Sequence, residues 1–199
     1  MIIKDLNINW KADGLSTYDW PAMDKNGKIA IMVNRSWGDL PKALLSNDNA
    51  KSLLNPFFEH IYEGLDEYSQ YSYNKHGQTI LDLYSNKYTD LKKRKDVEKL
   101  VAKLSKQKVL LDEGLSAKKG VFVYYGFLDY EENYFLVDYI GKIKTGDYYR
   151  SYLPTIYASI EDLPKELWPV IVVSDTVDFT KDRIFDNDKI SEYFPRMFS

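Results

Sequence analysis

Residues 18–45 constrain the fold more than any other stretch, because they contain the strongest short-range signal for a β-hairpin. Asn26 and Gly27 lie between two short apolar segments, and both residue types accept the positive φ angles of a tight hairpin turn. Across residues 28–34, Ile or Val alternates with other side chains, as in a strand with one deeply buried face. The pattern predicts two strands joined by a turn, followed by a short helix that Asp39 caps.

Helical spacing of apolar residues marks the middle of the chain. We expect a helix over residues 49–64 with a break near Asn55, because Pro56 follows it. Further helices are expected over residues 79–92 and, more clearly, over 95–107. A Lys-Lys-Arg-Lys run lies where the second of these helices would begin, and a helix N-terminus disfavours cations. One continuous helix, with these charges in its middle, is therefore an alternative.

The clearest strands come later in the chain. Residues 121–128 and 134–141 are rich in β-branched and aromatic side chains, and the five residues between them suit a hairpin loop. Residues 148–158 are expected to form a further strand. No repeat or linker divides the chain, so residues 1–199 are expected to form a single α+β domain. Its antiparallel sheet with hairpins would pack against helices from the middle of the chain.

The common catalytic and metal-binding motifs do not occur in this sequence. It contains no Cys, which excludes disulfides, zinc–thiolate sites and thiol nucleophiles. Its two histidines, His60 and His76, have no partner at the spacing of a helical zinc pair. No nucleophile elbow, Walker A loop or dinucleotide-binding glycine motif is found. We therefore expect no catalytic residue, no cofactor and no metal, and a chain that is not an enzyme.

Acidic residues do occur in clusters. Glu161 and Asp162 are adjacent in an expected cap, where neighbouring side chains point in different directions. Residues 182–192 carry several carboxylates but lack the central glycine of an EF-hand loop. Structural or solvent-exposed roles are expected for these groups. A small hydrolase with an unrecognised carboxylate site is an alternative, and it would show a concave pocket with converging, perturbed acids.

The net charge is −3, which gives no reason to expect general binding to nucleic acid or to anionic membranes. Residues 87–119, however, hold eleven Lys or Arg against five Asp or Glu, whereas residues 120–199 hold eight against fourteen. The basic segment makes a nucleic-acid-binding protein a second alternative. The start of the chain has no long apolar core and no stretch is apolar enough to span a membrane, so a cytoplasmic location is expected.

Two groups of short motifs resemble a family of small bacterial proteins, some of which are thought to act as immunity proteins of polymorphic toxin systems. The first group is Asp-x-x-Gly-x-Ile-Ala followed by Leu-Pro-Lys-Ala-Leu-Leu; the second is KKGVFVYYGF, Tyr-Leu-Pro-Thr-Ile-Tyr and Ile-Glu-Asp-Leu-Pro-Lys-Glu-Leu. Residues 34–38 depart from the glycines usual in that family, and residues 66–110 lie outside the resemblance. The resemblance implies a non-enzymatic protein that binds and neutralises a cognate protein toxin.

Candidate partner-binding residues follow from this interpretation. The 17 Tyr and 4 Trp suit a protein interface, because aromatic anchors carry much of the binding energy of such surfaces. Aromatic residues beside charges in expected loops provide the candidates. They are Arg35, Trp37 and Asp39 after the second strand, and Tyr130, Glu131 and Glu132 at the tip of the later hairpin.

Overall fold

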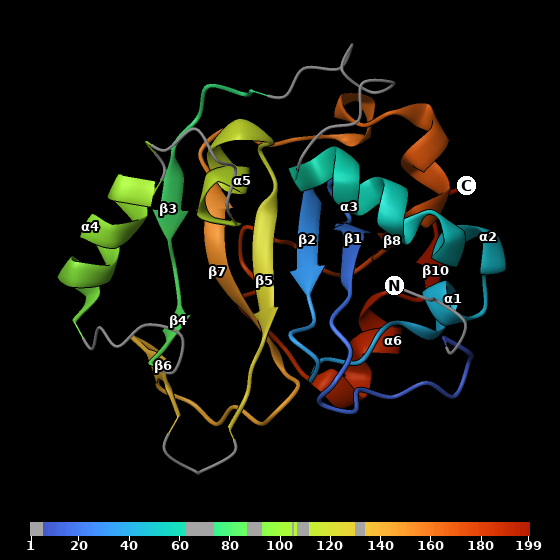
Figure 1. Ribbon diagram of the computed structural model, residues 1–199, viewed down its shortest axis with the longest axis horizontal. Helices are drawn as coiled ribbons and strands as arrows, with labels where there is room; N and C mark the ends of the chain where they lie inside the picture. The colour runs from blue at the N-terminus through green and yellow to red at the C-terminus, as the bar shows by residue number, and fades with distance from the viewer. Residues whose placement is uncertain (1–5, 63–73, 87–92, 105, 107–111, 130–133) are drawn as a thin grey trace.

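The computed structural model describes residues 6–62, 74–86, 93–104, 106, 112–129 and 134–199 (Figure 1). They form an α+β fold, as predicted, in which helices pack on a large and mostly antiparallel sheet. The sheet has eight strands in the order β10-β8-β1-β2-β5-β7-β3, and β9 pairs with β7. Its strands are β1 (Asp19–Met23), β2 (Ile29–Val33), β3 (Thr79–Leu81), β5 (Phe122–Gly126), β7 (Tyr148–Pro154), β8 (Val172–Val173), β9 (Ile184–Phe185) and β10 (Arg196–Met197).

The helices are short. They comprise α1 (Lys42–Leu45), α2 (Asp48–Ser52), α3 (Leu54–Tyr62), α4 (Arg94–Leu104), α5 (Asp112–Lys118) and α6 (Ile190–Tyr193), with 3₁₀ helices η3 (Ile160–Asp162), η4 (Lys165–Val170) and η5 (Asn187–Lys189). The break expected near Asn55 is confirmed, because Leu53 separates α2 from α3. Pro56 falls in the first turn of α3, where a missing N–H removes no helical hydrogen bond.

The hairpin of β1 and β2 is confirmed, but its turn chemistry differs from the prediction. Gly27 has a φ of 77°, whereas Asn26 does not adopt a positive φ. The Asp24 backbone N–H donates to Lys28 O and the Gly27 N–H donates to Asp24 O, both at about 3 Å. The Asp24 side chain also accepts from the N–H groups of Asn26 and Lys28. Asp24 therefore organises the turn, and Gly27 supplies its left-handed residue.

Two expectations about strand pairing and helices were wrong. Strand β5 does not form a hairpin with the 134–141 segment: it lies in the sheet between β2 and β7, and β6 (Leu136–Val137) pairs instead with β4 (Tyr84–Ser85). The helix expected over residues 79–92 is absent from residues 79–86, which contain β3 and β4 instead, and residues 87–92 lie outside the described residues. The hydrophobic periodicity of one segment does not show which distant strand it pairs with. In both cases the pairing strand decides the secondary structure.

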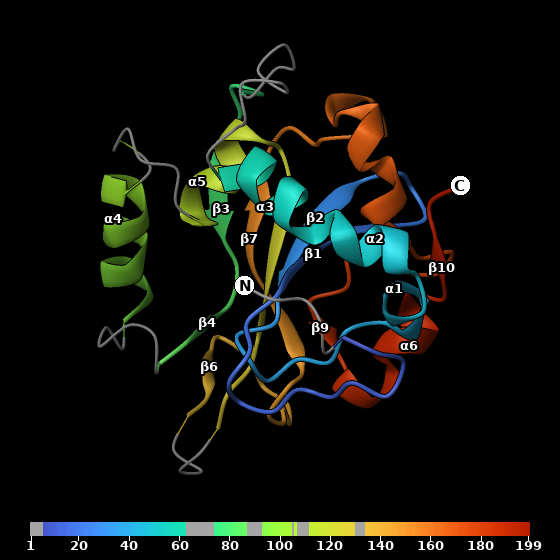
Figure 2. The ribbon, with the colours of Figure 1, turned by 45° about the vertical axis from the view of Figure 1, so that its right-hand side comes forward.

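The sheet is covered on both faces (Figures 1 and 2). Helices α2, α3 and α5 lie over one face, and the C-terminal segment with α6 lies over the other. On the C-terminal face, Phe194 packs edge-on against Trp20, and Phe179 packs against Phe122 and Tyr124. Helix α4 stands beyond β3 at the edge of the sheet in both views. Within the described residues, no helix is both long and apolar enough to cross a bilayer.

A partly buried ionic cluster links β3 and β9, the two strands that pair with the same edge of β7. Asp82 accepts hydrogen bonds from Arg150 Nε at 2.7 Å and from Arg183 Nη2 at 2.6 Å. The Arg150 side chain is 7% exposed and also donates to Phe179 O at 2.6 Å. Because charges removed from water need complete pairing, Asp82 holds β3, β7 and the segment leading to β9 in one arrangement.

Replacing Asp82 by Ala is expected to lower the free energy of unfolding by about 3 kcal/mol, because it leaves the Arg150 guanidinium buried without its carboxylate. The control is Glu98→Ala, which removes an ion pair to Arg94 in which both side chains are more than a third exposed. That change should lower the free energy by less than about 1 kcal/mol. Urea denaturation of both variants measures the difference, and equal effects would contradict this account of the cluster.

Candidate functional site

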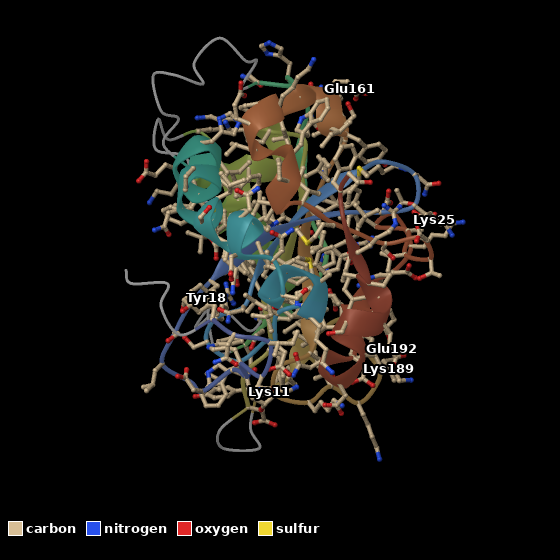
Figure 3. The ribbon with its side chains drawn as sticks, turned by 90° about the vertical axis from the view of Figure 1, so that its right-hand side faces the viewer. Lys11, Tyr18, Lys25, Glu161, Lys189 and Glu192 are labelled. Carbon is tan, nitrogen blue, oxygen red and sulfur yellow. The ribbon has the colours of Figure 1, made fainter. Side chains whose placement is uncertain are left out.

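An apolar cavity of about 520 Å³ lies between helix α3 and the end of the β1–β2 hairpin that is opposite its turn. We call it the α3 cavity. It is lined by Thr17, Tyr18, Asp19, Val33, Leu54, Asn55, Phe58, Tyr62 and Asp112. Figure 3 shows Tyr18 below α3, with Lys25 of the hairpin turn on the opposite side of the molecule. Strand β1 therefore runs from the cavity to the turn.

Sheet register builds the floor of the cavity. Asp19 pairs with Val33 across β1 and β2, Val33 with Tyr125 across β2 and β5, and Tyr125 with Tyr149 across β5 and β7. Residues paired in this way lie on one face of a sheet, because side chains alternate between faces along each strand. That face is the one covered by α3 and α5, so Asp19 lies under α3, whereas Trp20 faces the opposite side.

Helix α3 supplies the wall of the cavity by its own periodicity. Leu54, Phe58 and Tyr62 follow one another at intervals of four residues and line the cavity, whereas Phe57 and Ile61 are fully buried in the core. Phe58 is 43% exposed, and its ring centroid lies 4.6 Å from that of Tyr62. The wall therefore presents two adjoining aromatic rings.

Two carboxyl groups meet at the floor around one phenol. The Tyr62 hydroxyl lies near enough to both Asp19 and Asp112 for each carboxyl group to act on its pKa. Tyr125 donates a second hydrogen bond to Asp112 at 2.7 Å. A phenol has a single proton, so Tyr62 donates to one of the two carboxyls at a time. Asp112 has Tyr125 as a second donor, and Asp19 has no second donor among the described residues.

The protonation of the floor reflects this environment. Burial raises the pKa of Asp19 to about 7; the Tyr62 hydrogen bond opposes the increase, the Asp112 charge adds to it, and the Arg35 charge opposes it. Burial, followed by the charges of both aspartates, raises the pKa of Tyr62 far above its usual value, so the phenol keeps its proton. Asp19 therefore changes between its neutral and charged forms near neutral pH.

Arg35 is the sequence-predicted residue that the structure brings to this floor. Its guanidinium lies 3.4 Å from the centroid of the Tyr125 ring, and its Nη1 donates to the Tyr149 hydroxyl at 3.1 Å. The residue follows β2 and has a φ of 47°, in the left-handed region. Arg35 thus places a fixed cation beside the same row of paired residues that carries Asp19.

The other predicted residues lie elsewhere. Asp39 is 6% exposed, forms an ion pair with Lys11 and accepts from the Ala12 N–H at 3.0 Å. We expected Asp39 to cap the short helix, and this expectation was wrong. Pro41 occupies the N-cap position of α1, and no side-chain hydrogen bond is made there. Trp37 is half-buried, with its ring against Gly14, where a Cβ would come within 2.8 Å. Both residues therefore fix the N-terminal segment to the body of the protein.

The later candidates Tyr130, Glu131 and Glu132 lie outside the described residues. Of the acidic clusters, Asp162 completes a capping box with Ser159 and pairs with Lys75, while Asp186 and Asp188 pair with Lys144. These groups have structural partners, in agreement with the sequence-based expectation for them.

Sequence reasoning did not select Asp19, Tyr62 and Asp112. Asp19 and Asp112 lie far apart in the chain, and only acids that are neighbours in the sequence can be recognised there as a pair. One signal was present: Asp19 is a charged residue at the start of a strand whose other residues are apolar. A carboxylate in such a position needs a specific reason, because burial disfavours its charge.

The chain was compared with protein-family models, curated proteins and solved structures. No family model, no curated protein and no solved structure matches the chain.

Replacing Asp19 by Asn is expected to stabilise the protein at pH 8. The folded state holds the Asp19 proton more tightly than the unfolded chain, so its stabilising effect is complete below about pH 4 and is lost as the pH rises through about 7. Asn stays neutral, and the variant should gain up to about 2 kcal/mol over the wild type at pH 8 and little at pH 4. Urea denaturation between these pH values tests this.

The matched control is Glu59→Gln, which removes a carboxylate from the exposed side of α3, the helix that covers Asp19. This variant keeps Asp19 and should therefore keep the pH dependence of the wild type. A constant difference between Asp19→Asn and the wild type from pH 4 to pH 8 would contradict the assigned environment of Asp19.

Proposed function

We propose that this chain is a non-enzymatic protein-binding protein that neutralises a cognate protein toxin in the cytoplasm, and that it binds the toxin through the face around the α3 cavity. The observation that carries the proposal is the cavity itself, an apolar hollow with aromatic walls and a carboxyl floor. The sequence resemblance to immunity proteins supports the same class of function.

The face around the cavity has the composition of an interaction surface. Phe58 in the cavity wall is 43% exposed. Leu15, two residues before Thr17 of the cavity lining in the sequence, is 86% exposed. Tyr18, on the cavity rim, packs edge-on against Trp10 with the ring centroids 5.5 Å apart. Aromatic side chains that are already held in place lose little conformational freedom on binding, and Tyr and Trp are enriched among the residues that dominate interface energies. The rim therefore offers preorganised anchors.

The charge of the floor favours a basic partner. Asp19 and Asp112 both face the cavity, and their negative potential would attract a positively charged surface. Enzymes that act on nucleic acids bind the phosphate backbone with clusters of Lys and Arg. A toxin with a basic, nucleic-acid-binding cleft is the partner class that this floor complements.

The proposal is tested first by affinity capture from the native cell at moderate salt with nuclease added. A stoichiometric protein partner whose toxicity is suppressed by co-expression of this chain is the expected result. A captured partner that is not toxic, or whose toxicity this chain does not suppress, would contradict the proposal.

Phe58→Ala is expected to weaken binding to that partner at least tenfold, or by about 1.4 kcal/mol, because it removes an anchor from the cavity wall. Phe135→Ala is the control, since Phe135 is 52% exposed and lies outside the α3 cavity. Calorimetry with the purified partner measures both. Equal losses for the two variants, or no loss for Phe58→Ala, would place the binding face elsewhere.

One observation favours a second candidate, a small hydrolase. Acid–base catalysis uses carboxyl groups with different environments in a concave site, and Asp19, with a pKa of about 7, lies beside Asp112 in this cavity. In that case the wild type would hydrolyse a substrate with a pH profile set near 7, and Asp19→Asn would abolish the activity. The toxin-neutralising function requires no turnover.

A further inference from the structure

We propose that the floor of the α3 cavity binds the guanidinium group of an arginine side chain supplied by the protein partner. This inference rests on the proposed function, because the arginine belongs to the neutralised toxin. It adds the chemical identity of the group that enters the cavity and the residues that recognise it.

Hydrogen-bond acceptors at the floor exceed the donors around it. The carboxylates of Asp19 and Asp112 together offer four oxygens, and in the described part of the structure the hydroxyls of Tyr62 and Tyr125 can provide at most two protons to them. Acceptor capacity is thus left beside the cavity. A guanidinium carries five N–H donors in one plane and can bond two carboxylates together.

The charges that face Asp19 also favour an added cation. Asp112 approaches from α5, Tyr62 from α3, and Arg35 from the segment after β2. Tyr62 remains uncharged, so Arg35 opposes two carboxylates when Asp19 is ionised. One further monovalent cation would balance this group, whereas an anion would face two carboxylates at close range.

The walls select a flat cation over a compact one. The rings of Phe58 and Tyr62 are inclined by 37° to each other, and Leu54 and Val33 complete an apolar surround. A guanidinium is weakly hydrated and stacks on aromatic faces. An ammonium is strongly hydrated and loses more hydration free energy when it enters such a site.

The same molecule already shows this mode of binding next to the cavity. Arg35 lies over the Tyr125 ring at 3.4 Å and donates to the Tyr149 hydroxyl. Tyr125 in turn donates to Asp112 at the cavity floor. The sheet face that carries the floor is therefore suited to a guanidinium stacked on an aromatic ring, and the cavity offers a second place of this kind.

Binding would be coupled to a proton. Asp19 has a pKa of about 7, and a guanidinium at the floor stabilises its charged form. Arrival of the cation at neutral pH therefore releases a proton from Asp19, and the affinity rises between pH 6 and pH 8. This dependence distinguishes the floor from an ordinary exposed carboxylate, which is fully ionised over that range.

The test uses the full chain and n-butylguanidinium, and no toxin is needed. Titration followed by NMR is expected to show saturable binding in the millimolar range, with the signals of Tyr62 and of residues near Asp19 shifting most. Asp19→Asn and Asp112→Asn should each weaken binding at least fivefold, and Glu59→Gln should leave it unchanged. n-Butylammonium should bind at least threefold more weakly. Thermal unfolding of each variant shows that it is folded.

Each opposite result overturns the inference. No saturable binding, binding that persists in Asp19→Asn, or equal binding of the ammonium would exclude a guanidinium site at this floor. If toxin neutralisation holds while n-butylguanidinium fails to bind, the inference fails and the proposed function stands. If n-butylguanidinium binds as expected but no toxin is neutralised, the proposed function fails and the cavity is left as a guanidinium site of another kind.

Discussion

The parallel pairing of β2 with β5 is the constraint on which the rest of the structure depends. It joins the N-terminal hairpin to the strands of the second half of the chain, with Val33 opposite Tyr125. Parallel strands need a long crossover, and here the chain between them contains α1 to α5. The pairing therefore decides both where the helices lie and which side chains meet beneath them. Asp19 and Asp112 share a cavity because β1 pairs with β2 and α5 leads directly into β5.

The carboxylates with structural roles have more hydrogen-bond donors around them than Asp19 has. Asp82 accepts from two arginines, and Asp24 accepts from three backbone N–H groups, including that of Phe179. Such donors stabilise the charged form of a carboxyl group. Asp19, by contrast, interacts with the Tyr62 phenol, which also interacts with the carboxyl group of Asp112. A buried acid left in this condition lowers stability at neutral pH, and binding a cation would remove that penalty. Residues that reduce stability in this way are typical of functional sites.

Local signals in the sequence predicted much of the fold correctly. The hairpin at Gly27, the break before α3, the helix at α4 and the strand at β5 each follow from features within a few residues: turn chemistry, proline geometry or hydrophobic period. The errors share one cause. The 134–141 segment and the 79–86 segment were assigned from their own composition, but they are governed by pairing with β4 and β7. For the candidate site, Arg35 was selected from the sequence, whereas Asp19, Tyr62 and Asp112 were not.

The sequence by itself determined the class of the fold and the kinds of chemistry excluded by composition, because these depend on residue types and on spacing along the chain. Only the tertiary structure decided that Asp19 meets Asp112 and Tyr62 under α3, because that meeting depends on the register of β1, β2 and β5. Register is fixed by packing across the sheet and between distant segments, and no local pattern records it.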